Sequence, residues 1–266
     1  MSWRYWYIDR HILVEGQCPT EHAHWSPAAP LVHSRIIFVR SGVYLRRVNG
    51  VESWADSTTM LVARAGDELE VAHPLGCGDM FTYVDLVETD VRPGVYGLGD
   101  ELDLHHRRLV AAARRGTDRL ELGERVAQLV DRLPPQPCPQ DRWSPQTQRA
   151  HRKLAVGAAE ALIGSGYEAG LDGIAAQLSC SPHHLSRVFR RVTGLTLTEY
   201  RNRVRVGEVL ADIQDGARNM RELAARYGFA DQAHMIRVVR RHYGAAPGIL
   251  REVLEAPIAH GNTTRH

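Results

Sequence analysis

Residues 174–194 have the sequence IAAQLSCSPHHLSRVFRRVTG, and residues 223–244 have the sequence LAARYGFADQAHMIRVVRRHYG. The two stretches form an internal repeat, because small, apolar and arginine positions recur in the same order. Ala175 corresponds to Ala224 at an offset of 49, and one extra residue in the second turn makes the later offset 50. Each copy therefore predicts a helix, a tight turn and a second helix.

Both copies carry residues that begin and end the second helix. Ser181 and Pro182 are an N-cap residue followed by proline at the first helical position, which favours a helix start. Asp231 occupies the N-cap position in the second copy. Gly194 and Gly244 are expected to end the two helices, because glycine readily adopts a left-handed backbone. This order is typical of helix-turn-helix units, whose second helix enters the DNA major groove.

The outward face of each second helix carries arginines and small polar side chains. Repeated at matched positions, such a face favours a recognition helix over an ordinary solvated surface. Arg187 and Arg237 are expected to bind guanine edges, and Arg190 is expected to bind phosphate. The candidate DNA-binding residues are His183, His184, Ser186, Arg187, Arg190, Arg191, Gln232, His234, Ile236, Arg237, Arg240 and Arg241.

Residues 171–251 resemble the AraC/XylS family of bacterial regulators. Gly228 and Phe229 match the "GF" of the family's second turn, and Pro247 matches the proline after its second recognition helix. Residues 200–213 supply the joining helix. The resemblance implies a sequence-specific transcription regulator rather than an enzyme, with double-stranded promoter DNA and RNA polymerase as partners.

The second copy departs from the family pattern. The family's second recognition helix usually carries aromatic residues where this chain has Met235 and Val239, and a small polar residue where it has Ile236. The first copy keeps the pattern, with Phe189 in place. We therefore expect substitutions at Arg187 to impair sequence specificity more than matched substitutions in the second copy.

Charge and proline content divide the chain. Residues 1–140 carry 15 Arg and 19 Asp or Glu, a net charge of −4, whereas residues 141–266 carry 18 Arg or Lys and 12 Asp or Glu, a net charge of +6. A basic C-terminal half fits a polyanionic partner. Prolines concentrate in 134–144, which predicts a linker. The predicted domains are 1–133, for sensing or dimerisation, and 145–256, for DNA binding.

The N-terminal domain is predicted to be β-rich. Residues 31–97 contain short runs of strand-forming residues between turn sequences such as Asn49-Gly50, which is typical of a sandwich or jelly-roll barrel. Two helices are expected over 102–115 and 117–133. In front of an AraC-like module, this pattern resembles the family's cupin-type sensor domains. The expected fold has two domains, an N-terminal β-rich cupin-like barrel with two following helices and a C-terminal all-α double helix-turn-helix.

The apolar stripe of 117–133 fits either ordinary core or the seam of an expected homodimer.

Two kinds of site are predicted in the N-terminal domain. Barrel mouths commonly bind small molecules, and a small-molecule effector pocket is expected to involve His24, Phe38, Tyr44, Trp54 and Tyr83. His22 and His24 match the opening of a cupin metal motif, but the acidic ligand that should follow is missing. Cys and His together suit a softer divalent metal, and the candidate ligands are His22, His24, His73 and Cys77.

Three functions stay open at this point. A ligand-responsive or metal-sensing transcription regulator is one, and a metal-dependent cupin enzyme fused to a DNA-binding domain is another. The incomplete ligand set argues against the enzyme. A constitutive DNA-binding protein, with a front domain used only for assembly, is the third.

The remaining composition excludes several classes of protein. The four cysteines form no CxxC pair, so neither a zinc finger nor a disulfide framework is indicated. Residues 1–10 lack the basic and apolar regions of a signal peptide. No apolar run approaches membrane-spanning length, so a cytoplasmic protein is expected.

Overall fold

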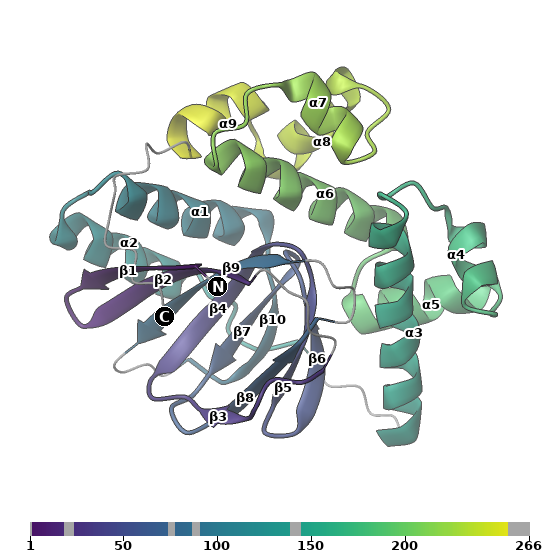
Figure 1. Ribbon diagram of the computed structural model, residues 1–266, viewed down its shortest axis with the longest axis horizontal. Coiled ribbons are helices and arrows are strands. Elements are labelled where there is room, and N and C mark those ends of the chain that lie inside the picture. The colour runs from purple at the N-terminus through teal and green to yellow at the C-terminus, as the bar shows by residue number, and fades with distance from the viewer. Residues whose placement is uncertain (1, 19–23, 74–77, 87–90, 139–144, 255–266) are drawn as a thin grey trace.

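The computed structural model describes residues 2–18, 24–73, 78–86, 91–138 and 145–254 (Figure 1). In that part of the chain ten strands precede nine helices. The strands are β1 (Ser2–Ile8), β2 (His11–Cys18), β3 (Ala29–Pro30), β4 (Ser34–Ser41), β5 (Tyr44–Val48), β6 (Val51–Ala55), β7 (Thr59–Ala63), β8 (Glu68–Ala72), β9 (Asp79–Leu86) and β10 (Gly94–Gly97). The helices are α1 (Asp100–Arg114), α2 (Arg119–Asp131), α3 (Pro145–Gly164), α4 (Leu171–Gln177), α5 (Pro182–Thr193), α6 (Leu197–Gln214), α7 (Met220–Arg226), α8 (Gln232–Tyr243) and α9 (Pro247–Leu254).

The strands form two sheets. One has the order β1-β2-β9-β4-β7-β10, and the other has the order β3-β8-β5-β6. The predicted β-rich domain followed by two helices is confirmed. Closure into a barrel is not found among the described strands, and a cupin fold is not confirmed, because the edge strands of the two sheets do not pair with each other. The architecture is an open two-sheet sandwich.

Strand β4 explains why this sandwich acquires a helical layer. Its run Ile36-Ile37-Phe38-Val39 is almost fully buried. Side chains alternate across a strand, so Ile36 and Phe38 enter the core formed with α1 and α2, whereas Ile37 and Val39 face the four-stranded sheet. A strand that is apolar on both faces needs a layer on each side. Helices α1 and α2 provide one layer, and the second sheet provides the other (Figure 1).

The hairpin of β1 and β2 lies outside the predicted β region. Ser2 pairs with Gln17 and Ile8 with His11, and Asp9 in the two-residue turn has a left-handed φ of +48°. Two runs rich in strand-forming residues on either side of Asp9 and Arg10 are the sequence feature that indicates this hairpin. The hairpin places Glu15 beside the helical layer, where it matters below.

The two predicted helices of the N-terminal domain are confirmed. Asp118 caps α2 by accepting hydrogen bonds from the backbone N–H groups of Leu120 and Glu121. The apolar stripe of α2 packs into the core through Val126 and Leu129. These positions of the stripe are therefore ordinary core, and the seam of a homodimer stays a prediction. Leu120 is 71% exposed and stays outside it.

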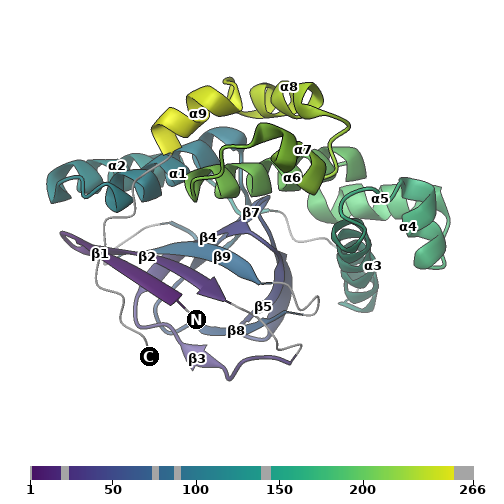
Figure 2. The ribbon, with the colours of Figure 1, turned by 45° about the horizontal axis from the view of Figure 1, so that its top comes forward.

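The C-terminal helices surround the sandwich on two sides. Figures 1 and 2 show α6 to α9 lying over α1, and α3 to α5 beside the sheet that contains β5 and β6. Before α3, the Cys138 N–H donates to the Val95 carbonyl at 2.7 Å, so the described part of the predicted linker lies along β10. Among the described helices none is long and apolar enough to cross a membrane.

Candidate nucleic-acid interface

Helices α5 and α8 begin as the sequence predicts. The Ser181 hydroxyl accepts a hydrogen bond from the His184 backbone N–H at 3.2 Å, and Pro182 occupies the first turn. The Asp231 carboxylate accepts one from the His234 backbone N–H at 2.6 Å. Each cap satisfies a donor that the first turn of a helix leaves unpaired. The start of both recognition helices is thus fixed locally.

Glycines with positive φ shape the two units. Gly194 (φ +77°) and Gly244 (φ +71°) end α5 and α8, which confirms the predicted stops. Gly228 (φ +63°) lies in the second turn, where a Cβ atom would come within 2.7 Å of a carbonyl oxygen in the loop after α3. Next to it Phe229 is buried, and the Arg205 guanidinium of α6 lies 3.7 Å from its ring centroid. The "GF" pair therefore anchors the second turn to the joining helix.

The two recognition helices bury matching faces. The residues with at most 6% exposure are Leu185, Val188 and Phe189 in α5, and Met235, Val238 and Val239 in α8. Every pair is separated by 50 positions, as the sequence repeat requires. Because the inward faces correspond, the outward faces correspond as well. This equivalence could not be obtained from either copy alone.

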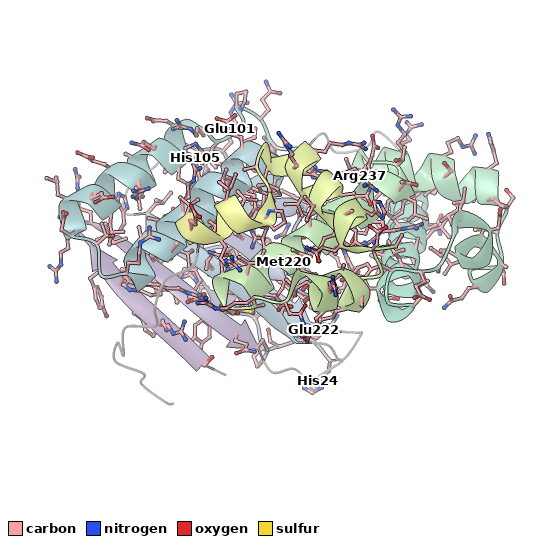
Figure 3. All side chains as sticks on the ribbon, turned by 90° about the horizontal axis from the view of Figure 1, so that it is seen from above. His24, Glu101, His105, Met220, Glu222 and Arg237 are labelled. Atoms are coloured by element: carbon pink, nitrogen blue, oxygen red, sulfur yellow. The ribbon has the colours of Figure 1, made fainter. Side chains whose placement is uncertain are left out.

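The outward faces carry the predicted DNA-binding residues. The exposed ones are His183, Ser186, Arg187, Arg190, Arg191, Arg237, Arg240 and Arg241, and the half-buried ones are His184, Gln232, His234 and Ile236. Figure 3 looks down on the helices and shows Arg237 on α8, on the helical side of the molecule. The β-domain does not cover Arg187 or Arg237, so both guanidinium groups are accessible to a nucleic acid.

Three of these side chains also have contacts inside the protein. The His184 ring meets the His151 ring of α3 edge-on, at 6.3 Å between centroids. His234 Nδ1 accepts a hydrogen bond from the Ala230 backbone N–H at 3.4 Å. Arg191 lines a cavity shared with the β-domain. These contacts give His184, His234 and Arg191 structural roles that the sequence did not indicate.

A buried ionic cluster joins the β-domain to the end of α6. Arg40 of β4 donates to Gln214 Oε1 at 3.0 Å. Arg114 of α1 donates to the Gln214 carbonyl at 3.0 Å and to Asp215 Oδ1 at 2.9 Å. Both arginines also bind the carboxylate of Glu15, which is 5% exposed. The N-terminal domain thus supplies cations to the C-terminal end of a helix, where the helix dipole favours them.

Electrostatics make Glu15 the centre of this cluster. Burial alone would raise the pKa of Glu15, but Arg40 and Arg114 more than offset that effect and lower its pKa to about 2. Burial lowers the pKa of Arg40 to about 10, although Glu15 counteracts it. Glu15 therefore stays ionised at neutral pH. No sequence pattern indicates the cluster, because its members are up to 200 residues apart.

A second polar junction lies near the start of α6. The buried Asp56 carboxylate accepts hydrogen bonds at 2.6 Å from both the Trp54 indole N–H and the Tyr200 hydroxyl. Thr58 donates to its other oxygen from the backbone at 2.8 Å and from the side chain at 2.6 Å. Asp56 thereby fixes a ring from each domain. Burial, followed by the charge of Asp56, raises the pKa of Tyr200 well above its usual value, so its hydroxyl remains a donor.

A cavity of about 470 Å³ opens beside this junction. Its apolar wall includes Trp54 and Val95 of the β-domain together with Val156 and Phe189 of the helical region, and Arg191 is among its polar lining residues. Ligand pockets of small molecules typically measure roughly 300–1,000 Å³. The cavity is therefore large enough for a small molecule that would touch both domains.

The predicted effector residues do not converge on one pocket among the described residues. Trp54 alone of the five lines the cavity. Phe38 is fully buried and stacks on His106, and Tyr44 is buried beside His73. Tyr83 lies beneath the Arg35 guanidinium. His24 lies at the periphery of the molecule in Figure 3 and is exposed. An aromatic residue in a strand can face the core or a pocket, and the sequence pattern does not distinguish the two.

Of the predicted metal ligands, the two that the structure describes, His24 and His73, do not meet. His22 and Cys77 lie outside the described residues. His73 meets Asp79 and Cys18, and His24 is not part of this group. Of the predicted set of His22, His24, His73 and Cys77, only His73 is found in a cluster of possible metal ligands. Its neighbours there, Cys18 and Asp79, were not in that set.

Comparisons with known proteins agree with the helical geometry. A family model described as a helix-turn-helix domain matches residues 174–252. The probable transcription factor PqrA of Proteus vulgaris is 32% identical over 90 residues, which are 34% of this chain and 74% of that protein. The HTH-type transcriptional activator RhaS of Escherichia coli (strain SE11) is 31% identical over 85 residues, which are 32% of this chain and 31% of that protein.

Two solved structures illustrate the range of similarity. ToxT from Vibrio cholerae O395 aligns with 91% of this chain and 98% of its own, at 10% identity and a TM-score of 0.37. The DNA-binding domain of the global transcriptional factor AdpA, solved with a target DNA, aligns with 37% of this chain and 89% of its own, at 25% identity and a TM-score of 0.35.

Two helix-turn-helix units that present matched arginine faces define a DNA-binding transcription regulator. The chain belongs to the AraC/XylS family of such regulators. This confirms the resemblance predicted from the repeat. The family consists of transcription factors, so the alternative of a fused enzyme is not supported.

Proposed function

We propose that α5 and α8 enter successive major-groove segments of double-stranded promoter DNA, with Arg187 and Arg237 binding base edges. The carrying observation is that both arginines are exposed at matched positions, 50 residues apart, on helices with matched buried faces. Bidentate donors on a planar guanidinium suit guanine O6 and N7. Arg190 and Arg240 lie nearer the helix ends and bind phosphates. RNA polymerase remains a partner predicted from the family resemblance, and a second copy of the chain remains a partner predicted from the sequence.

Genome-wide mapping of bound sites supplies the operator for the test. Arg187→Ala should weaken binding to that operator roughly ten- to a hundredfold and relax the preference at one base pair. Arg190→Ala, on the same helix, should weaken specific and non-specific DNA about equally and reduce the salt slope by about 1. Footprints and salt slopes that do not distinguish the two variants would contradict the assignment.

The two recognition helices should contribute unequally. His234 and Gln232 are half-buried, and the imidazole of His234 already accepts a backbone hydrogen bond. The matched residues of α5, His184 and Pro182, are half-buried as well. The outward faces differ at Ser186, which is exposed, and at the matched Ile236, which is half-buried and has no polar side-chain atom to offer a base. We expect Arg187→Ala to relax sequence preference more than Arg237→Ala, as the family comparison of the sequence suggests. Selection of binding sites from a random pool by each variant measures the difference, and equal losses would contradict it.

We also propose that a small, mainly apolar effector binds the cavity between the β-domain and the α3–α5 unit. The supporting observation is that residues from both domains line it, including Trp54, Phe189 and Val156. A ligand there interacts with both domains at once, so it favours the arrangement in which they are docked. This location replaces the predicted mouth of the barrel.

A substitution that fills the cavity tests this proposal. Val156→Trp places a large ring into the cavity, whereas Lys153→Trp introduces the same ring at an exposed position of α3. A thermal-shift screen of a small-molecule library should identify compounds that stabilise the wild type and Lys153→Trp but not Val156→Trp. Hits that stabilise all three proteins equally would place the effector elsewhere.

A further inference from the structure

Three potential metal ligands meet at one end of the sandwich. The Cys18 sulfur, one ring nitrogen of His73 and one carboxylate oxygen of Asp79 all lie within 4.8 Å of one another. They come from the end of β2, the residue after β8 and the first residue of β9. Cys18 and Asp79 are directly paired in the ladder between β2 and β9. Strand register therefore places the thiol next to the carboxylate.

The protein holds His73 and Asp79 in fixed positions. Both are buried, at 5% and 3% exposure, and His73 Nε2 lies 2.6 Å from Asp79 Oδ1. The Tyr44 ring packs against the imidazole, at 5.6 Å between centroids. On the other side Gly42 has a φ of +76°, and a Cβ atom there would lie 2.9 Å from the Asp79 Cα. Ligands fixed in this way lose little freedom on binding a metal.

We propose that Cys18, His73 and Asp79 bind a zinc ion, with the fourth position open to water. Zinc takes thiolate, imidazole and carboxylate ligands in tetrahedral sites, with bonds of about 2.0–2.3 Å. Those bonds place neighbouring ligand atoms about 3.3–3.8 Å apart in a tetrahedron, so the cluster needs only a small adjustment. On binding, the thiol proton passes to solvent, and neutral His73 coordinates through one ring nitrogen while its proton lies on the other.

The donor set selects the type of metal. A thiolate ligand disfavours magnesium and calcium, which take oxygen ligands. Three protein ligands with one open position match the zinc sites that accept an exchangeable fourth ligand. The site shares only His73 with the set that the sequence suggested. Its other two members could be found only from the pairing of β2 with β9.

The proposed zinc site lies close to a contact with the DNA-binding region. The Gly42 backbone N–H donates to Glu208 Oε1 of α6 at 2.8 Å. Gly42 packs against Asp79 and is itself hydrogen-bonded to α6, the helix that joins the two helix-turn-helix units. A metal that shifts the Asp79 carboxylate would therefore affect α6 through Gly42. Zinc occupancy would thereby bias the docking of α6 onto the β-domain. This coupling rests on the AraC-type function, whereas the zinc site itself does not.

Metal titration of the full-length protein tests the site. After removal of metal with a chelator, Zn²⁺ is titrated against a chromophoric competitor, and Co²⁺ is used as a spectroscopic probe of sulfur ligation. We expect one equivalent to bind, with a sulfur-to-cobalt charge-transfer band. Cys18→Ser and Asp79→Asn should each lower affinity at least tenfold, and Cys18→Ser should abolish the band. Cys138→Ser and Cys180→Ser change thiols outside the cluster and should bind like the wild type.

The outcomes separate the alternatives. If the wild type does not bind Zn²⁺ stoichiometrically, the proposal is overturned. It is also overturned if Cys18→Ser keeps the Zn²⁺ affinity and the cobalt charge-transfer band of the wild type. Far-ultraviolet circular dichroism confirms that each variant is folded; if Cys18→Ser is not, Asp79→Asn provides the same test of affinity. For the coupling, hydrogen exchange of α6 should slow on adding Zn²⁺ to the wild type but not to Cys18→Ser. Unchanged exchange in the wild type would refute the coupling and leave the zinc site standing.

Discussion

Replacing Glu15 by glutamine should destabilise the protein in a pH-dependent way. Glu15 lies between Arg40 and Arg114 and is 5% exposed, so solvent screens these contacts little. Its pKa falls from 4.5 to about 2 on folding. Each unit of difference corresponds to about 1.4 kcal/mol, so the ionised carboxylate contributes about 3 kcal/mol. Loss of one partner from a buried ionic cluster typically costs a similar amount, about 3–5 kcal/mol.

The sign of the pH dependence follows from the direction of the shift. Because the folded-state pKa of Glu15 lies below the unfolded value, its contribution is fully present above pH 4.5 and declines as the pH falls towards 2. Glu15→Gln should therefore lose about 3 kcal/mol at pH 7 relative to the wild type, and about half of that difference should remain at pH 3.

Equilibrium urea unfolding, followed by far-ultraviolet circular dichroism, measures this difference. Glu124→Gln is the matched control, because Glu124 is exposed on α2 in the same domain. The control should stay within about 0.5 kcal/mol of the wild type. If Glu15→Gln is as stable as the control at pH 7, or if its deficit is the same at pH 7 and pH 3, the assignment of Glu15 as the centre of the cluster is refuted.

Four further substitutions test the helix ends, α4 and α6. Gly194→Ala should destabilise the protein by about 1–2 kcal/mol, because φ at Gly194 is +77°. Gly173→Ala, inside α4, adds a methyl group in open space and should stabilise the protein by about 0.5–1 kcal/mol. Thermal unfolding of both variants measures the difference. Asp231→Ala removes the cap of α8 and should cost about 1 kcal/mol, with faster hydrogen exchange in its first turn. Burial raises the pKa of Glu208 to about 7, so the wild type loses stability as Glu208 ionises between pH 4.5 and 7. In urea unfolding, the stability of Glu208→Gln relative to the wild type should therefore increase from about pH 5 to about pH 8. A difference in unfolding free energy that stays constant over this range would contradict the prediction.

The helical region was largely predictable because its determinants are local. Ser181 and Pro182 begin α5, and Gly194 ends it, within one stretch of sequence. Duplication then provides an independent check, because the same determinants recur 50 residues later. What the sequence could not show is which outward side chains have partners inside the protein. His184 meets a ring from α3, and Arg191 lines the cavity, through contacts that depend on tertiary packing.

The N-terminal domain was predictable in class but not in detail. Alternation in β4 indicates strands, but it does not say whether Phe38 faces a pocket or the core, where it lies. Buried arginines were also missed. In composition Arg40 and Arg114 look like any of the 32 arginines of the chain. They differ only because folding brings Glu15 and the end of α6 to them. Long-range pairing of charges leaves no periodic trace in a sequence.

Helix α6 is the element through which events in the β-domain would reach DNA. Its N-terminal half belongs to the core of the first helix-turn-helix unit, and its C-terminal half belongs to the core of the second. Its contacts with the β-domain include those of Tyr200, Glu208 and Gln214, which lie eight and six residues apart, roughly two turns of the helix in each case. These contacts adjoin, in order, the cavity, the proposed zinc site and the ionic cluster around Glu15. Because all three contacts are polar rather than apolar, each depends on charge or hydrogen bonding that a ligand, a metal or a proton alters. A change at any one of them therefore acts on the helix that sets the relative position of α5 and α8.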